Sequence, residues 1–301
     1  MIVVLFLFGF IFYLGFPLWG AWRVRRSWNI FRGLCLEALS STEVSLFDIE
    51  PNLPAPHTSR LLIGTLEAFE GTHRLWIGNT DLSLPVSLKN SPVYFLDEPP
   101  GPFVAGVEPP RKAEASSLGA LSEGTNFLVF GHLESDEKGQ THFAATDAQS
   151  LLVMAFEGDP HTVLNRAIYA GRATIDHWNS WTPVSLAAGM TAFLFWGYLN
   201  LTSGGWRSGG ILALVGALLP STFFLPPGIF LFYAFARLWS QARDHRARMD
   251  LVRLSMGKDA APWKQLRDAA RKREWLAHIL LGIGMLTNAA LLAFVLRLWV
   301  P

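Results

Sequence analysis

The chain opens with an apolar run. Residues 1–22 contain no charged side chain, and about 20 apolar residues are enough for a helix to cross a bilayer. The pattern predicts a first transmembrane helix over 1–22. A cleaved signal peptide is the alternative, but such peptides have a basic start and a small-residue cleavage site. Here the run starts Met-Ile-Val-Val and the arginines follow it, which favours an uncleaved anchor.

Two further apolar stretches predict spans of ordinary length. The stretch 184–201 follows Pro183 and is expected to form the second transmembrane helix. The stretch 276–300 is expected to form the last one, and Arg297 near its end is long enough to reach the interface.

The apolar stretch 210–239 is longer than one straight crossing needs, and prolines interrupt it at Pro220 and at Pro226-Pro227. It predicts either one kinked span or a re-entrant pair of shorter segments, 211–219 and 223–235. Because the first of these segments is too short to cross a bilayer alone, we favour a kinked third transmembrane helix, which gives four spans in all.

Between the first two spans lies a polar region, 33–182, with short runs of alternating apolar and polar residues separated by turns. Such runs predict strands. Helical spacing is found at 33–46 and at 161–175, where Asp159 and Pro160 form a start signal. We therefore expect a membrane protein of the α+β class, with four transmembrane helices and an inserted small β-barrel or OB-like domain closed by one helix. The expected strands are Arg60–Leu66, His73–Ile77, Pro92–Leu96, Phe103–Val107, Asn126–Leu133, Thr141–Ala145 and Leu151–Phe156.

Charge is distributed unevenly along the chain. The region 33–182 contains 19 acidic and 8 basic residues, whereas 240–275 contains 10 basic and 5 acidic residues. An acidic domain argues against a nucleic-acid partner. The segment 240–275 reads as a basic helical hairpin. The preference of basic residues for the cytoplasmic side of a membrane explains its charge best. Contact with anionic lipid and docking on the acidic domain are the alternatives.

Basic residues flank the spans on one side. Arg23, Arg25 and Arg26 follow the first span, and the basic hairpin follows the third. Two crossings separate these clusters, so both can lie on the same face. Since basic residues favour the cytoplasmic side, we expect a multi-pass protein of the bacterial inner membrane with its soluble domain in the cytoplasm. Most tryptophans also flank spans, as in an interfacial belt, whereas Trp76 is expected in the core of the domain.

Several short motifs in the domain resemble the GIDE or BAM domain. This domain occurs in membrane-anchored ubiquitin ligases of the mitochondrial MULAN type and in their prokaryotic relatives. The similar segments are Gly64-Thr65-Leu66-Glu67, Leu84-Pro85-Val86-Ser87, Pro92-Val93-Tyr94-Phe95, Glu123 through Gly131 and Thr141 through Phe156. They lie within Arg60–Ala173, and the order of span, domain and span is similar too.

The chain departs from that family in two ways. A RING needs a set of cysteine and histidine zinc ligands, and Cys35 is the one cysteine of the sequence. Ligase activity is therefore not expected from the resemblance. The domain of the mitochondrial proteins faces the intermembrane space, whereas the charge pattern here places it in the cytoplasm.

Candidate chemistry is limited to a few histidines. His132 and His142 fall on neighbouring expected strands, with Glu134 or Asp147 as a possible carboxylate partner for acid–base chemistry. His177 precedes the second span. Surface histidines are common on small barrels, and motifs for nucleophilic, zinc-protease or phosphate-binding sites do not occur. We therefore assign no catalytic, cofactor-binding or metal-binding residue.

These patterns predict a non-enzymatic membrane scaffold, assembly factor or regulatory subunit that contacts membrane lipid and presents its β domain to a protein partner. Two alternatives remain open. One is a membrane-embedded enzyme that uses a groove between the domain and the membrane around His132, His142 and His177. The other is a ligase-like adaptor that recruits a separate catalytic chain. Clustering of the histidines in a pocket would favour the enzyme.

Overall fold

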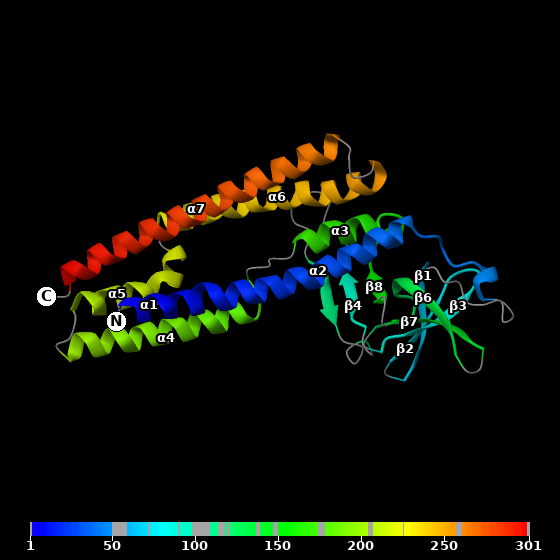
Figure 1. Cartoon of the computed structure of the whole chain (residues 1–301). Coiled ribbons are helices and arrows are strands. Elements are labelled where there is room, and N and C mark those ends of the chain that lie inside the picture. The colour runs from blue at the N-terminus through cyan, green and yellow to red at the C-terminus, as the bar shows by residue number, and fades with distance from the viewer. Residues whose placement is uncertain are drawn as a thin grey trace. The chain divides into compact units, whose positions relative to one another are not determined.

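The structure is a computed structural model of the chain (Figure 1). It describes residues 2–49, 59–71, 73–89, 91–97, 109–113, 118, 121–136, 139–146, 150–173, 178–203, 207–224, 226–256 and 261–299. The chain divides into two compact units, and each is described by itself. Unit 1 comprises residues 1–27, 175–249 and 259–301, and unit 2 comprises residues 28–174 and 250–258.

Unit 2 contains a closed five-stranded β-barrel. The strands follow the order β1-β2-β3-β7-β6, and pairing of β1 with β6 closes the ring. Strands β8, β4 and β5 continue from β6 as a sheet. This arrangement confirms the expected small barrel, and it fits the OB type. The strands are β1 (Arg60–Glu70), β2 (Arg74–Gly78), β3 (Ser83–Ser87), β4 (Val93–Leu96), β5 (Arg111–Ala113), β6 (Asn126–Ser135), β7 (Thr141–Ala144) and β8 (Leu152–Phe156).

Two of these strands were not expected from the sequence. Strand β3 contains Pro85, and proline within a run argues against a paired strand because it has no N–H to donate. Pro85 is nevertheless the register partner of Trp76 on β2. Strand β5 has only three residues. The expected strand Phe103–Val107 lies outside the described residues.

Strand β8 is buried on both faces, because it lies between two hydrophobic clusters. Val153 and Ala155 point into the barrel cluster, together with side chains of the ring strands. Leu152, Met154 and Phe156 point the other way, into a cluster with two helices. Alternation with period two therefore divides one strand between two cores.

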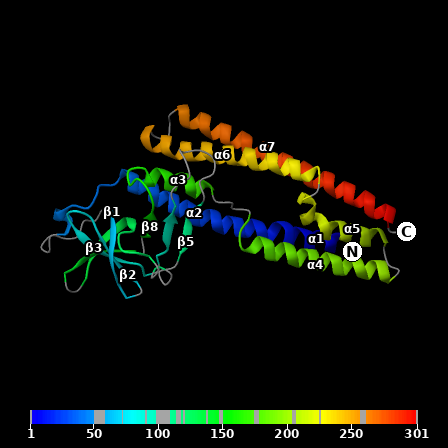
Figure 2. The same cartoon turned by 180° about the vertical axis from the view of Figure 1, so that it is seen from behind.

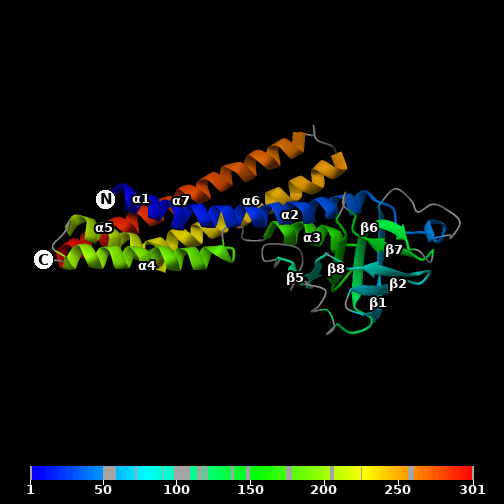
Figure 3. The ribbon, with the colours of Figure 1, turned by 60° about the horizontal axis from the view of Figure 1, so that its bottom comes forward.

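The two helices are the C-terminal half of α2 (Phe16–Ser40) and α3 (Val163–Ala173), which run side by side (Figures 1 and 3). Phe31 and Cys35 of α2 are fully buried. The Arg32 guanidinium donates a hydrogen bond of 3.0 Å to the carbonyl oxygen of Gly171 at the end of α3. The expected first span and the expected helix at 33–46 thus share one helix, which ends at Ser40 and is followed by a 3-10 turn, η2 (Leu46–Ile49).

Helix α3 starts later than its sequence signal. The Asp159 carboxylate accepts a hydrogen bond from the His161 N–H, which forms a turn before the first helical residue. At the other end, Arg172 makes a bidentate ion pair with Asp250, which lies in the last turns of α6 (Gly228–Met256). This pair belongs to unit 2, and the Asp250 side chain is only 10% exposed.

Unit 1 is helical. Three of the described helical segments, which lie in this unit or begin in it, are long and apolar enough to span a membrane. They are Leu7–Ser40, Trp181–Thr202 and Pro262–Leu298. The expected third span, 210–239, is instead divided among α5 (Arg207–Leu218), the 3-10 segment η4 (Leu219–Phe224) and α6. A 12-residue helix is about 18 Å long, which is shorter than the hydrocarbon core of a bilayer. The expected total of four spans is therefore not confirmed.

The first span is irregular. It consists of α1 (Ile2–Gly9), a π-helical segment η1 (Phe10–Gly15) and the start of α2. Helix α4 (Trp181–Thr202) packs beside it: the Ser185 hydroxyl donates to the Phe12 carbonyl oxygen, and a side chain at Gly189 would collide with the Tyr13 ring. Tyr13 in turn donates a hydrogen bond of 2.8 Å to the Gly216 carbonyl oxygen of α5. Polar and small residues of this kind commonly hold membrane helices together.

The expected basic hairpin is helical in the described residues on both sides of its turn. Its first arm is the end of α6 and its second is the start of α7 (Ala261–Trp299), which continues past Trp275 into the last span without a break. The two helices run side by side (Figures 1 and 2). Arg246 of α6 makes two hydrogen bonds of 2.9 and 2.8 Å to the Glu274 carboxylate of α7.

This hairpin is expected to lose stability in mild acid. Burial lowers the pKa of His245, the neighbouring Arg273 and Arg248 lower it further, and Asp244 opposes them. The folded hairpin therefore takes up a proton at His245 less readily than the unfolded chain does. Its contribution to stability is complete above the ordinary pKa of about 6.5 and is lost as the pH falls below that value.

The measurement is thermal unfolding of the full chain in detergent, followed by circular dichroism at about pH 7.5 and about pH 5.5. The His245→Gln variant should show a smaller drop between the two conditions than the unsubstituted chain. His161→Gln, at an exposed position in unit 2, is the control and should leave the drop unchanged. An equal drop in all three proteins would contradict the role of His245.

Candidate functional site: a cavity at the seam of the barrel

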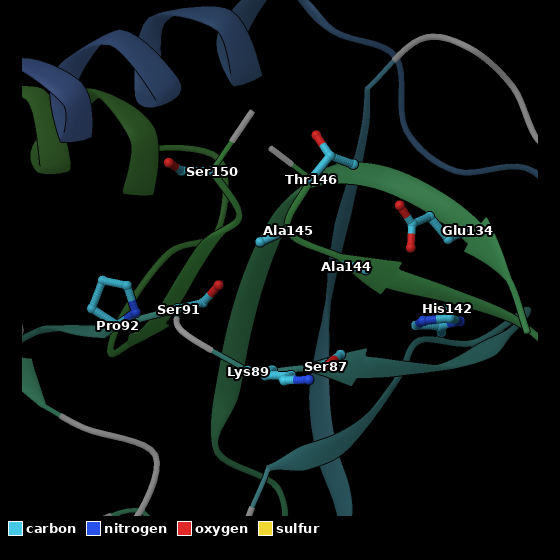
Figure 4. Close-up of a pocket in the computed structure, with 10 residues that line it drawn as sticks. All are labelled: Ser87, Lys89, Ser91, Pro92, Glu134, His142, Ala144, Ala145, Thr146 and Ser150. Atoms are coloured by element: carbon cyan, nitrogen blue, oxygen red, sulfur yellow. The ribbon is translucent and has the colours of Figure 1, made fainter. Parts of the chain in front are cut away.

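The barrel has a short seam between β3 and β7. These parallel strands share one register pair, Val86 with Phe143. After Ser87 the chain stays paired on the β2 side, where the Leu88 N–H donates to the His73 carbonyl oxygen (2.7 Å). It then turns, and the Ser91 N–H donates to the Leu88 carbonyl oxygen (3.0 Å). The two strands therefore diverge after this pair, and a cavity of about 470 Å³ opens on the outer wall (Figure 4).

Strand alternation decides which side chains face this cavity. Leu133 and Phe143 point into the barrel and are buried, so their neighbours Glu134 and His142 point outward. The other lining residues come from the end of β3, the turn after it and the segment after β7. The full lining is Ser87, Lys89, Ser91, Pro92, Glu134, His142, Ala144, Ala145, Thr146 and Ser150 (Figure 4).

The lining offers hydrogen-bonding groups of both kinds. Glu134 and His142 are register partners on β6 and β7, so a carboxylate and an imidazole lie next to each other. Lys89 adds a cation, and the hydroxyl groups of serine and threonine can donate or accept. The Nδ1 atom of His142 is buried and has no hydrogen-bond partner. A buried ring nitrogen without a partner is an unsatisfied hydrogen-bonding group.

The structure brings together some of the candidates named from the sequence. His142 and Glu134 line the cavity, as expected for neighbouring strands. His132 is the register partner of Ala144 and faces the same outer wall, but it is not part of the lining. Asp147 and His177 lie outside the described residues. Among the residues that the structure describes, no group of histidine, cysteine, aspartate and glutamate side chains could hold a metal ion.

Ser87, Lys89, Thr146 and Ser150 were not recognised from the sequence. Each belongs to a polar stretch with an ordinary turn composition, so no local signal marks it. Their shared position follows from the pairing of β3 with β7, which lie more than fifty residues apart. Only the order of strands in the barrel could have identified them.

The rest of the barrel wall is polar. Within its described strands, Phe69 is the one large apolar side chain with a high exposed fraction, 36%. Trp76, which was expected in the core, instead lies half-buried on the outer wall, and its indole N–H donates a hydrogen bond of 3.2 Å to Glu70. A polar wall of this kind is unsuited to a large obligate interface, which is normally more apolar.

Comparison of the chain with protein-family models, with curated proteins and with solved structures finds no match.

Proposed function

We propose that this chain is a non-enzymatic membrane scaffold whose barrel binds an extended segment of a protein partner at the open end of the β3–β7 seam. The observation that supports this proposal is the cavity itself. It opens where two strands stop pairing, and its walls are polar. Extended peptides bind at such places by adding main-chain hydrogen bonds, while side-chain pockets supply specificity.

The lining suggests how a partner segment is held. Backbone groups of the segment can pair with the diverging ends of β3 and β7, beyond Val86 and Phe143. A polar side chain of the segment can then fill the cavity and bond to Lys89, Glu134 or His142, which line it. Such an interface is small and reversible, as in signalling and assembly contacts.

The enzyme alternative has one supporting observation, the adjacency of Glu134 and His142. A histidine that acts as a general base is usually oriented by a hydrogen bond to its second ring nitrogen. Nδ1 of His142 has no such bond, which favours binding over catalysis. A ligase-like adaptor that recruits a catalytic chain would use the same cavity and is one form of the scaffold.

The membrane setting is part of the proposal. We place the chain in a bacterial inner membrane, with unit 2 in the cytoplasm and α5 to α6 as the remaining crossing. The basic residues after Trp22 and those of the hairpin support this orientation. We also propose kinship with GIDE or BAM domain proteins, because the similar segments cover β7, β8 and parts of β1, β3, β4 and β6, all in a single unit.

The test is site-specific photo-crosslinking in intact cells. A photoreactive amino acid replaces Ser87, which lines the cavity, and in a separate strain it replaces Thr80, which is exposed on the turn between β2 and β3. We expect a discrete adduct from position 87 and none from position 80. Introducing Ser150→Trp, which fills the cavity, should reduce the adduct by about tenfold, since each 1.4 kcal/mol of lost affinity is a factor of ten.

Mass spectrometry of the adduct identifies the partner and so tests the proposed orientation in the membrane. A cytoplasmic protein cross-linked through an extended segment supports both the scaffold and the orientation. A periplasmic protein would overturn the orientation. If the adduct persists in the Ser150→Trp protein, or if position 80 gives the same adduct, the seam is not the binding site.

A further inference from the structure

Five tryptophans of the chain are each followed, four residues later, by an arginine. Residues four apart on a helix are neighbours, and in four of these pairs the guanidinium lies over the indole ring. In the fifth pair, Trp28 and Arg32, the guanidinium instead donates to the Gly171 carbonyl oxygen. The distances from Cζ to the ring centre are 5.5 Å for Arg23 over Trp19, 5.9 Å for Arg26 over Trp22, 5.2 Å for Arg243 over Trp239 and 4.9 Å for Arg267 over Trp263. These are cation–π pairs.

The first two pairs lie at the end of the first apolar span. Trp19 packs edge-on against Trp181 at the start of α4, with ring centres 5.4 Å apart. Asn179, which is buried, lies against Gly20 and donates a hydrogen bond of 3.3 Å to the Pro17 carbonyl oxygen. This contact fixes α4 beside α2, all within unit 1.

The face made by these residues is exposed, and the charged side chains that the structure describes on it are both arginines. Trp19, Trp22 and Trp181 are 44%, 56% and 44% exposed, and Arg23 and Arg26 are exposed beside them. No acidic residue occurs in the sequence 1–27. The ligand that complements this face must therefore be negatively charged and must lie at the depth where indole rings anchor a helix, the membrane interface.

We propose that Trp19, Trp22, Arg23, Arg26 and Trp181 form a binding face for the headgroup of an anionic phospholipid. A guanidinium presents paired N–H donors that match two oxygens of a phosphate. Stacking on the indole holds each guanidinium in place before the lipid arrives, which reduces the entropy lost on binding. The indole rings contact the glycerol and upper acyl region. This lipid site is separate from the seam and does not depend on the proposed partner.

The experiment measures lipid retention by the full chain. The protein is reconstituted with phosphatidylcholine and phosphatidylglycerol, extracted in mild detergent, and analysed by native mass spectrometry for bound phosphatidylglycerol. A basic residue near an anionic surface contributes roughly a fivefold gain in affinity, so Arg23→Gln with Arg26→Gln should weaken retention by about 25-fold. Arg23→Lys with Arg26→Lys keeps the charge and should retain most of the binding.

The control variant removes two positive charges, as the test variant does, but at the Trp263–Arg267 pair on the hairpin. Lys264→Gln with Arg267→Gln breaks a Trp–Arg stack that lies about 18 Å along α7 from Trp275, at 1.5 Å per residue. It should leave retention unchanged. Equal loss in the two glutamine variants would show that net charge alone attracts the lipid and would overturn the site. Undiminished retention in the Arg23→Gln, Arg26→Gln protein would overturn it as well.

Discussion

The Gly64→Ala variant is expected to destabilise unit 2 by about 3 kcal/mol, because one added methyl group has no space there. Gly64 lies on β1 where that strand pairs with β6, as the register partner of Phe127. A Cβ atom at this position would collide with the backbone carbonyl of Gly78 at the end of β2. Backbone cannot rotate away as a side chain can, so β1 and β2 would have to separate.

The readout is already present in the chain. Cys35 is its one cysteine and is fully buried in unit 2, so a thiol reagent labels it only when that unit opens. Labelling is followed against denaturant concentration. Gly33→Ala is the matched control: its Cβ would meet open space, and alanine is favoured over glycine in a helix by about 1 kcal/mol. The Gly33→Ala variant should move the midpoint of Cys35 labelling to a higher denaturant concentration. Similar midpoints for the two variants would contradict this account of Gly64.

The Phe31→Ala variant is expected to cost about 3–5 kcal/mol, the usual range for removing a buried phenyl ring. Phe31 is fully buried on α2. Its ring lies 4.4 Å from that of Tyr94 on β4 and 5.3 Å from that of Trp28. Its removal would leave a cavity between α2, α3 and the sheet, and the helix would lose its ring contact with Tyr94 on β4.

The neighbouring residue provides the control. Ile30 precedes Phe31 on the helix and is 51% exposed, so Ile30→Ala should change the free energy of unfolding obtained from Cys35 labelling by less than about 0.5 kcal/mol. If the two substitutions had equal effects, α2 would not be docked on the sheet through Phe31.

Patterns within short stretches of the sequence were enough to predict several strands and the spans near both termini. Strands β1, β6 and β8 were expected because their side chains alternate or form short apolar runs. The spans near both termini were expected from length and hydropathy alone. The continuity of α2 was missed because Arg23–Ser27 is polar, yet Trp28, Phe31, Cys35 and Ala38 repeat with helical spacing.

The features that were missed depend on distant parts of the chain. Pro85 marks β3 as an improbable strand unless its partners β2 and β7 are known. The cavity depends on where β3 stops pairing with β7, and the hydroxyl groups that line it have no pattern of their own. His142 and Glu134 could be expected to be neighbours, since a single turn joins their strands.

The division of β8 between two cores limits which fragments of unit 2 can fold by themselves. A fragment that kept the barrel strands and β8 but lacked the two helices would expose Leu152, Met154 and Phe156 to water. Conversely, the helical layer packs on these three residues together with Tyr94 and Leu96 of β4, so without β8 it would lose part of the surface that it covers. The cluster that includes the helices draws on residues from Phe31 to Ala170, so α3 must be synthesised before that core is complete. We infer that unit 2 folds late relative to its own synthesis, after α3 has left the ribosome.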